Sequence, residues 1–162
     1  MKAGIVMGSR SDYKAVERAE KILDGFAVDY ETRIISAHRT PSAAEEFARG
    51  AEEEGIEVII AAAGKAAHLG GVIAAYTPLP VIGLPIKSST LDGLDSLLSM
   101  VQMPRGVPVA TVAIDGAENA ALLAVQILSV KYAQLREAMI TYKANMEREV
   151  LRDDAEFQSE KI

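Results

Sequence analysis

The chain contains only two histidines, and each lies where an apolar segment gives way to the start of a helix. His38 lies in the segment Ser36-Ala37-His38-Arg39-Thr40-Pro41, and His68 lies at the next such turn along the chain. Open α/β sheets bind ligands at strand-to-helix turns, and imidazole is the side chain whose pKa lies near neutrality. The two turns therefore predict a site for proton transfer.

The segment around His38 also carries groups that bind anions. Arg39 is a permanent cation whose planar guanidinium group matches a phosphate or a carboxylate, and Ser36 offers a neutral hydroxyl. A lone histidine in this position would more often be a surface residue near a capped helix. Because Arg39 and Ser36 accompany His38 at a sheet edge, we favour a functional site.

A third turn, from Gly8 to Asp12, follows the first expected strand. Gly8 allows a tight bend, and Ser9 and Ser11 place hydroxyl groups beside the free N–H groups of the next helix, which would suit a phosphate or a ribose. The turn lacks both the dinucleotide-binding and the phosphate-loop glycine patterns. A simple helix cap formed by Ser11 or Asp12 is an equally good interpretation.

Small side chains precede the second histidine, in Gly64-Lys65-Ala66-Ala67. Such residues leave backbone N–H groups accessible to a carboxylate or an oxyanion. His68 falls inside the expected helix, so by itself it reads as a structural or ligand-orienting residue. Lys65 is either a solvated side chain or the partner of an anion.

Composition excludes several other kinds of function. The net charge of −6 argues against a general binder of nucleic acids or anionic membranes. The absence of cysteine rules out disulfides, thiolate catalysis and cysteine metal sites. Two widely spaced histidines make a poor metal site, and no Gly-x-Ser-x-Gly elbow supports acyl transfer. Metal-free and cofactor-free proton transfer on a small anionic molecule remains.

Nothing in the sequence indicates export or membrane insertion. The apolar segment 1–7 is too short for the core of a signal peptide, and no apolar stretch reaches transmembrane length without an interruption. We therefore expect a cytoplasmic protein.

Strand-like and helical segments alternate along one domain, which predicts a parallel sheet with right-handed crossovers in a three-layer α/β/α sandwich. The expected strands cover 2–7, 28–35, 56–62, 79–84 and 109–114, and the expected helices cover 12–25, 41–54, 66–76, 88–100 and 118–130. The catalytic domain would span residues 1–130.

The remaining segment, 131–162, forms a separate helical extension. A long charged helix is expected over 132–153, with an apolar stripe of Leu135, Met139, Tyr142, Met146 and Val150. This stripe would either fold back on its own domain or, at least as readily, pack on a neighbouring subunit. Residues after Asp154 are expected to fray.

Taken together, these segments resemble the PurE family, class I N5-carboxyaminoimidazole ribonucleotide mutase of purine biosynthesis. The resemblance extends from Ile5 to about Val130. Besides the three turns, its matching blocks are Pro80-Val81-Ile82-Gly83, Leu94-Asp95-Ser96-Leu97-Leu98-Ser99, Val101-Gln102-Met103-Pro104, Gly106-Val107-Pro108-Val109 and Asn119-Ala120-Ala121-Leu122-Leu123-Ala124.

The resemblance implies a five-stranded flavodoxin-like fold and a homo-octamer whose sites lie between subunits. It also implies an aminoimidazole ribonucleotide substrate, whose carboxylate moves from the exocyclic nitrogen to ring carbon C4 without a metal or a cofactor. The pocket should be closed and dry, so that released CO2 stays beside the ring.

The resemblance further assigns roles to individual residues. It implies that His38 is the catalytic acid–base group. The ribose phosphate is held by residues of the first two turns, namely Ser9, Ser11, Asp12, Ser36 and Arg39. The migrating carboxylate is bordered by residues of the third turn, namely Ala63, Gly64, Lys65, His68 and Leu69. Gly8, Ala37 and Ala66 are further substrate-binding residues.

The third turn departs from the family's usual Gly-Ala-Gly-Gly-Ala-Ala-His-Leu-Pro-Gly block. Ala62 and Lys65 replace glycines, and Gly70 replaces a proline, which should loosen the start of the helix. Three alternatives stay open beside the mutase. They are a direct carboxylase that uses CO2, a non-catalytic nucleotide-binding or FMN-binding module, and a paralogue inactivated by the Lys65 and Gly70 changes.

Overall fold

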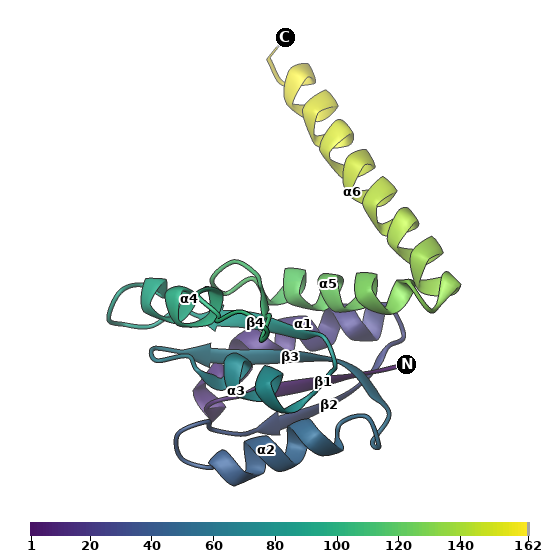
Figure 1. Ribbon diagram of the computed structural model, residues 1–162. Helices are drawn as coiled ribbons and strands as arrows, with labels where there is room; N and C mark the ends of the chain where they lie inside the picture. The colour runs from purple at the N-terminus through teal and green to yellow at the C-terminus, as the bar shows by residue number, and fades with distance from the viewer. Residues whose placement is uncertain (162) are drawn as a thin grey trace.

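A five-stranded parallel sheet forms the centre of the computed structural model, which describes residues 1–161 (Figure 1). The strand order is β2-β1-β3-β4-β5, and every neighbouring pair is parallel. The strands are β1 (Lys2–Met7), β2 (Asp29–Ile34), β3 (Ile56–Gly64), β4 (Val81–Ile86) and β5 (Ala110–Thr111). The predicted three-layer α/β fold is confirmed.

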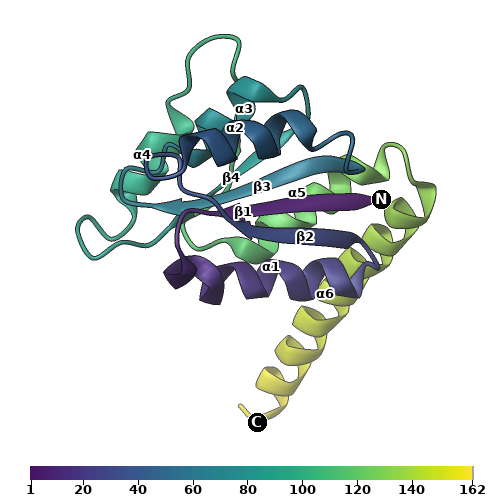
Figure 2. The same cartoon turned by 90° about the horizontal axis from the view of Figure 1, so that it is seen from below.

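Helices cover both faces of the sheet (Figure 2). One face carries α1 (Tyr13–Gly25) and α5 (Ala117–Ser129), which contact each other, and the other carries α2 (Pro41–Gly50) and α3 (Leu69–Tyr76). A short helix, α4 (Leu94–Val101), packs against β4 and β5.

The central strand β3 has the composition of a strand in a parallel sheet that is covered on both faces. Its sequence IEVIIAAAG is almost entirely buried, as expected for a strand covered by helices on both faces. Ile60 faces the apolar core beneath α1 and α5, whereas Ile59 faces the core beneath α2 and α3. Alanines in the helices, such as Ala44 and Ala121, are fully buried and allow the layers to approach closely.

The fourth strand lies two residues later than predicted, because β4 runs from Val81 through Pro85 to Ile86, whereas the sequence predicts 79–84. The carbonyl of Pro85 accepts the N–H of Asp115, so this residue faces the β5 side of the strand. The β4–β5 ladder has already ended at Gly83 and Thr111. Proline therefore sacrifices no ladder hydrogen bond at this position.

Four elements are shorter than predicted by three residues or more. The helix α2 ends at Gly50 instead of residue 54. The fifth strand covers Ala110–Thr111 alone, α4 starts at Leu94 after a left-handed Gly93 (φ 99°), and α3 starts at Leu69. Before α3, the N–H groups of Ala67 and His68 bond to carbonyls two residues earlier, which is tighter than a helix allows. Residues 65–68 and 87–93 therefore form open turns at the carboxyl ends of β3 and β4.

The C-terminal helix α6 (Ala133–Ser159) projects away from the sheet (Figure 1). Leu135 and Met139 are buried against the domain, but Met146 is 50% exposed and Val150 is 68% exposed. Folding back on the domain thus accounts only for the first turns. The expected fraying after Asp154 is wrong, because the helix continues to Ser159. No helix within residues 1–161 combines the length and the apolar character needed to cross a membrane.

Candidate active site

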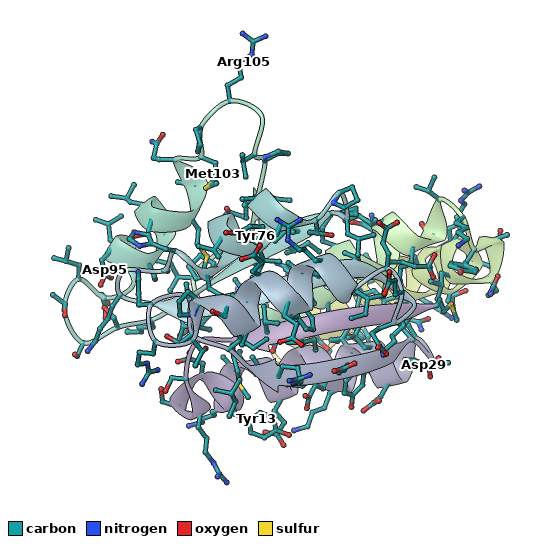
Figure 3. The ribbon with its side chains drawn as sticks, turned by 60° about the horizontal axis from the view of Figure 1, so that its bottom comes forward. Tyr13, Asp29, Tyr76, Asp95, Met103 and Arg105 are labelled. Atoms are coloured by element: carbon teal, nitrogen blue, oxygen red, sulfur yellow. The ribbon has the colours of Figure 1, made fainter. Side chains whose placement is uncertain are left out.

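A cavity of about 620 Å³ lies at the carboxyl ends of β1, β2, β3 and β4. In Figure 3, Tyr13 and Asp95 mark this end of the molecule, and Asp29 marks the opposite end. Of the residues named from the sequence, the cavity lining contains all except His68. Four further lining residues, which no sequence motif predicts, come from the end of β4 and the turn after it, namely Ile86, Lys87, Ser88 and Ser89.

The two histidines contact each other directly. Nε2 of His38 lies 2.9 Å from Nδ1 of His68, and the two rings meet edge to face at 80°. One nitrogen in this contact must donate and the other must accept. The contact fixes the orientation of each ring relative to the other. Sequence spacing alone could not predict this contact.

Both imidazoles are exposed in the single chain. The closed and dry pocket expected from the sequence is therefore not formed by one chain alone. The turns assemble the reacting groups on an open edge of the sheet, and water can reach His38 unless another surface covers it.

Arg39 links the first two turns. Its guanidinium group donates to the carbonyl of Gly8 at 2.9 Å and to Oγ of Ser36 at 3.3 Å. Beside it, Oγ of Ser9 accepts hydrogen bonds from the N–H and the hydroxyl of Ser11. A fixed cation and two hydroxyl groups thus lie together, which suits a phosphate group.

Asp12 is the one carboxylate among the described residues that line the cavity, and it is only 8% exposed. Burial is the largest influence and raises the pKa of Asp12 above its ordinary value. Hydrogen bonds from Ser11 and Ser9 and the charge of Arg39 act in the opposite direction without cancelling it. A hydroxyl donor on a ligand would therefore stabilise the ionised carboxylate of Asp12 by a hydrogen bond.

Lys65 follows directly after β3 and has a left-handed backbone, with φ of 56°. For a residue with a side chain this conformation costs about 1–2 kcal/mol. The carbonyl of Lys65 accepts the N–H of Ala67 at 2.9 Å and so closes the turn that leads to His68. Within residues 1–161, its ammonium group has no hydrogen bond or ion pair. The same residues contain no cluster of three side chains suited to a metal ion.

Comparison with known proteins identifies the family. The sequence matches the AIR carboxylase family over residues 2–149. The chain belongs to the AIR carboxylase family. It is 63% identical to the N5-carboxyaminoimidazole ribonucleotide mutase of Pyrococcus abyssi, over 91% of this chain and 84% of that protein. The mutase of Thermotoga maritima is 58% identical, over 93% of this chain and 88% of that protein.

Other relatives bear a different name. The phosphoribosylaminoimidazole carboxylase of Schizosaccharomyces pombe is 57% identical over 91% of this chain, but the match covers only 27% of that protein. Among solved structures, Treponema denticola PurE superimposes with a TM-score of 0.86 at 28% identity, covering 96% of this chain and 97% of that one. The mutases match over nearly their whole length, whereas the carboxylase contains much additional sequence.

The backbone and the packing show what two of the departures from the family's block cost. A left-handed φ at residue 65 is a conformation that glycine adopts without strain, so Lys65 is the costlier residue there. Gly70 lies in the first turn of α3, where an added Cβ would make ordinary contacts of 3.6–3.7 Å with Val109 and Ala61. Packing therefore does not require a glycine at residue 70.

We expect Asp12→Asn to stabilise the ligand-free protein near neutral pH. The pKa of Asp12 is raised in the folded state, so ionisation of Asp12 destabilises that state once the pH exceeds the raised value. The gain should vanish in acid, where both side chains are neutral. Thermal unfolding across pH measures this difference, with Asp29→Asn at the far end of the sheet as the control. A gain that persists unchanged in acid would contradict the burial argument.

Proposed function

We propose that the chain is an N5-carboxyaminoimidazole ribonucleotide mutase, which moves a carboxylate from the exocyclic nitrogen of an aminoimidazole ribonucleotide to ring carbon C4. The observation that carries the proposal is the position of His38. Its imidazole contacts His68 and lines the same cavity as the Arg39–Ser9–Ser11 group. The names of relatives that match along nearly their full length support the same reaction.

In the proposed mechanism, Arg39, Ser9 and Ser11 hold the phosphate, and Asp12 accepts a hydrogen bond from a ribose hydroxyl. Protonated His38 donates its proton to the exocyclic nitrogen as the bond from nitrogen to the carboxylate carbon breaks and releases CO2. The electron-rich carbon C4 then attacks this CO2 and forms the new carbon–carbon bond. Neutral His38 removes the proton from C4, so the proton returns to the imidazole with each turnover.

His68 has a positioning role in this scheme. Its ring orients His38 through the 2.9 Å contact. His38 can therefore donate and accept a proton without a large change in position. No step uses a metal or a cofactor, so activity should survive treatment with EDTA.

Three rival functions make different predictions. A direct carboxylase would convert the bare aminoimidazole ribonucleotide at a rate that depends on bicarbonate, and relatives with that name exist. An FMN-binding module would stack its ligand on aromatic rings, yet the described lining residues contain no aromatic side chain other than His38. A paralogue inactivated at Lys65 and Gly70 would bind the nucleotide without turnover.

The test is an assay at low bicarbonate of two substrates, the carboxylated nucleotide and the bare aminoimidazole ribonucleotide. It compares the wild-type protein with two variants. Wild-type protein should interconvert the two carboxylated nucleotides without added bicarbonate. His38→Asn should lower kcat by about 100-fold or more, as expected for loss of a general acid–base group. Arg39→Leu should instead raise KM about tenfold, because it removes charge-assisted hydrogen bonds to the phosphate.

Turnover that requires bicarbonate and starts from the bare nucleotide would replace the mutase with the carboxylase. Retention of most of the wild-type kcat by His38→Asn would refute the acid–base role. An unchanged KM in Arg39→Leu would argue against the phosphate contact.

The proposal includes an oligomer in which neighbouring copies complete each site. Both histidines are exposed in the single chain, and the mechanism needs CO2 to be retained. The outer part of α6 is also unpaired, and it borders an apolar groove between α5 and α6. The groove is lined by Asn119, Leu122, Leu123, Gln126, Met139, Tyr142, Lys143 and Met146. Residues 131–162 would act as an arm on a neighbouring copy, although Ile162 lies outside the described residues.

Light scattering should give the mass of a homo-octamer for the wild-type protein. Met146→Asp should dissociate the assembly, because it places a charge in an apolar contact. Glu149→Gln, on the same helix, should leave the mass unchanged. A monomeric wild-type protein with full activity would contradict the arm. The cytoplasmic location stays a prediction.

A further inference from the structure

Three cationic side chains line the cavity among the described residues, and only one of them lacks a partner in the protein. Arg39 is held by Gly8 and Ser36, as described above. The ammonium group of Lys87 lies 2.9 Å from a carboxylate oxygen of Asp92. Lys65 has no such contact within residues 1–161 and contributes a free positive charge to the lining.

The left-handed backbone at Lys65 is unfavourable for a residue with a side chain. Among residues 1–161, four non-glycine residues have positive φ, and two of them are aspartates, which tolerate this conformation. Of the other two, Ala27 lies in the turn between α1 and β2, whereas Lys65 lines the cavity. Strained residues that persist at a cavity point to a use for the side chain.

The position of Lys65 separates it from the phosphate-binding group. Arg39, Ser9 and Ser11 come from the turns after β1 and β2, whereas Lys65 comes from the turn after β3, three residues before His68. The cavity lining thus takes one cationic side chain from the turn after β2 and another from the turn after β3.

The proposed substrate has two anionic groups, a phosphate and a carboxylate. We infer that Lys65 is a specificity-determining residue whose ammonium group pairs with the carboxylate of the nucleotide. This inference rests on the proposed function and assigns the second anion to the second cation. Lys65 attracts the carboxylate before and after its transfer, but it has no charge to attract in neutral CO2. The residue therefore selects carboxylated nucleotides over the bare aminoimidazole ribonucleotide.

Lys65→Met tests the inference, because methionine keeps an unbranched side chain on the same strained backbone and removes only the charge. The measurements are KM for the carboxylated nucleotide and the inhibition constant of the bare nucleotide without bicarbonate. Lys65→Met should raise KM about tenfold, the expected loss for one charge-assisted hydrogen bond. The inhibition constant should change less than about twofold, because the bare nucleotide lacks the carboxylate partner. Lys65→Arg should restore most of the KM.

Two controls keep the result interpretable. Lys65→Gly removes the charge and the backbone strain together, so it should show the same selective rise in KM even if Lys65→Met is unstable. Ala27→Gly relieves strain at a turn outside the cavity and should change neither constant.

An equal change in both constants, or no change in either, would overturn the role of Lys65. A different result would contradict the proposed function, namely that the wild-type protein does not interconvert the carboxylated nucleotides. In that case the assignment of the carboxylate to Lys65 falls with it.

Discussion

The parallel pairing of β1, β2 and β3 is the constraint on which the site depends. Because the strands run in one direction, the turns after Met7, Ile34 and Gly64 all open at one edge of the sheet. The apolar β3 is stable only between two layers of helices, and that burial holds the turns at fixed separations. The sheet therefore brings residues that are far apart in the sequence to one cavity.

The charged and polar side chains of the cavity suit different parts of a ligand. Arg39 and the two serines favour a phosphate near β1 and β2, and the buried carboxyl of Asp12 favours a hydroxyl donor beside them. The contact between the two imidazoles orients His38 toward its position in the cavity lining. One chain leaves both imidazoles exposed to water, and this exposure is the reason for the proposed assembly.

Much of the site could be predicted from the sequence because strand-to-helix turns are local features. Ser9, His38 and Arg39 sit at such turns, and knowledge of a parallel sheet is enough to bring them together. The contact between His38 and His68 depends on the tight turn before α3, which Ala67 and His68 form in place of the helix expected from residue 66. Periodicity carries no signal for such a turn.

Other misses have similar physical causes. Pro85 looked like the end of a strand, but whether a proline can stay in a sheet depends on which neighbour its nitrogen faces. Ser88 and Ser89 fall within the helix predicted over 88–100, because the left-handed Gly93 that delays α4 has no unique sequence pattern. The predicted α6 ends too early because the apolar stripe that indicates the helix stops at Val150. Ion pairs such as Arg152–Glu156 are compatible with a helix that continues beyond it.

The most direct test of the account is a crystal structure of the protein with the carboxylated nucleotide bound to His38→Asn. The phosphate of the nucleotide should lie against Arg39, Ser9 and Ser11, and the aminoimidazole ring of the nucleotide should lie within reach of residue 38. A neighbouring copy should also cover this ring from water. A nucleotide bound elsewhere, or residue 38 open to bulk solvent in every assembled copy, would contradict it.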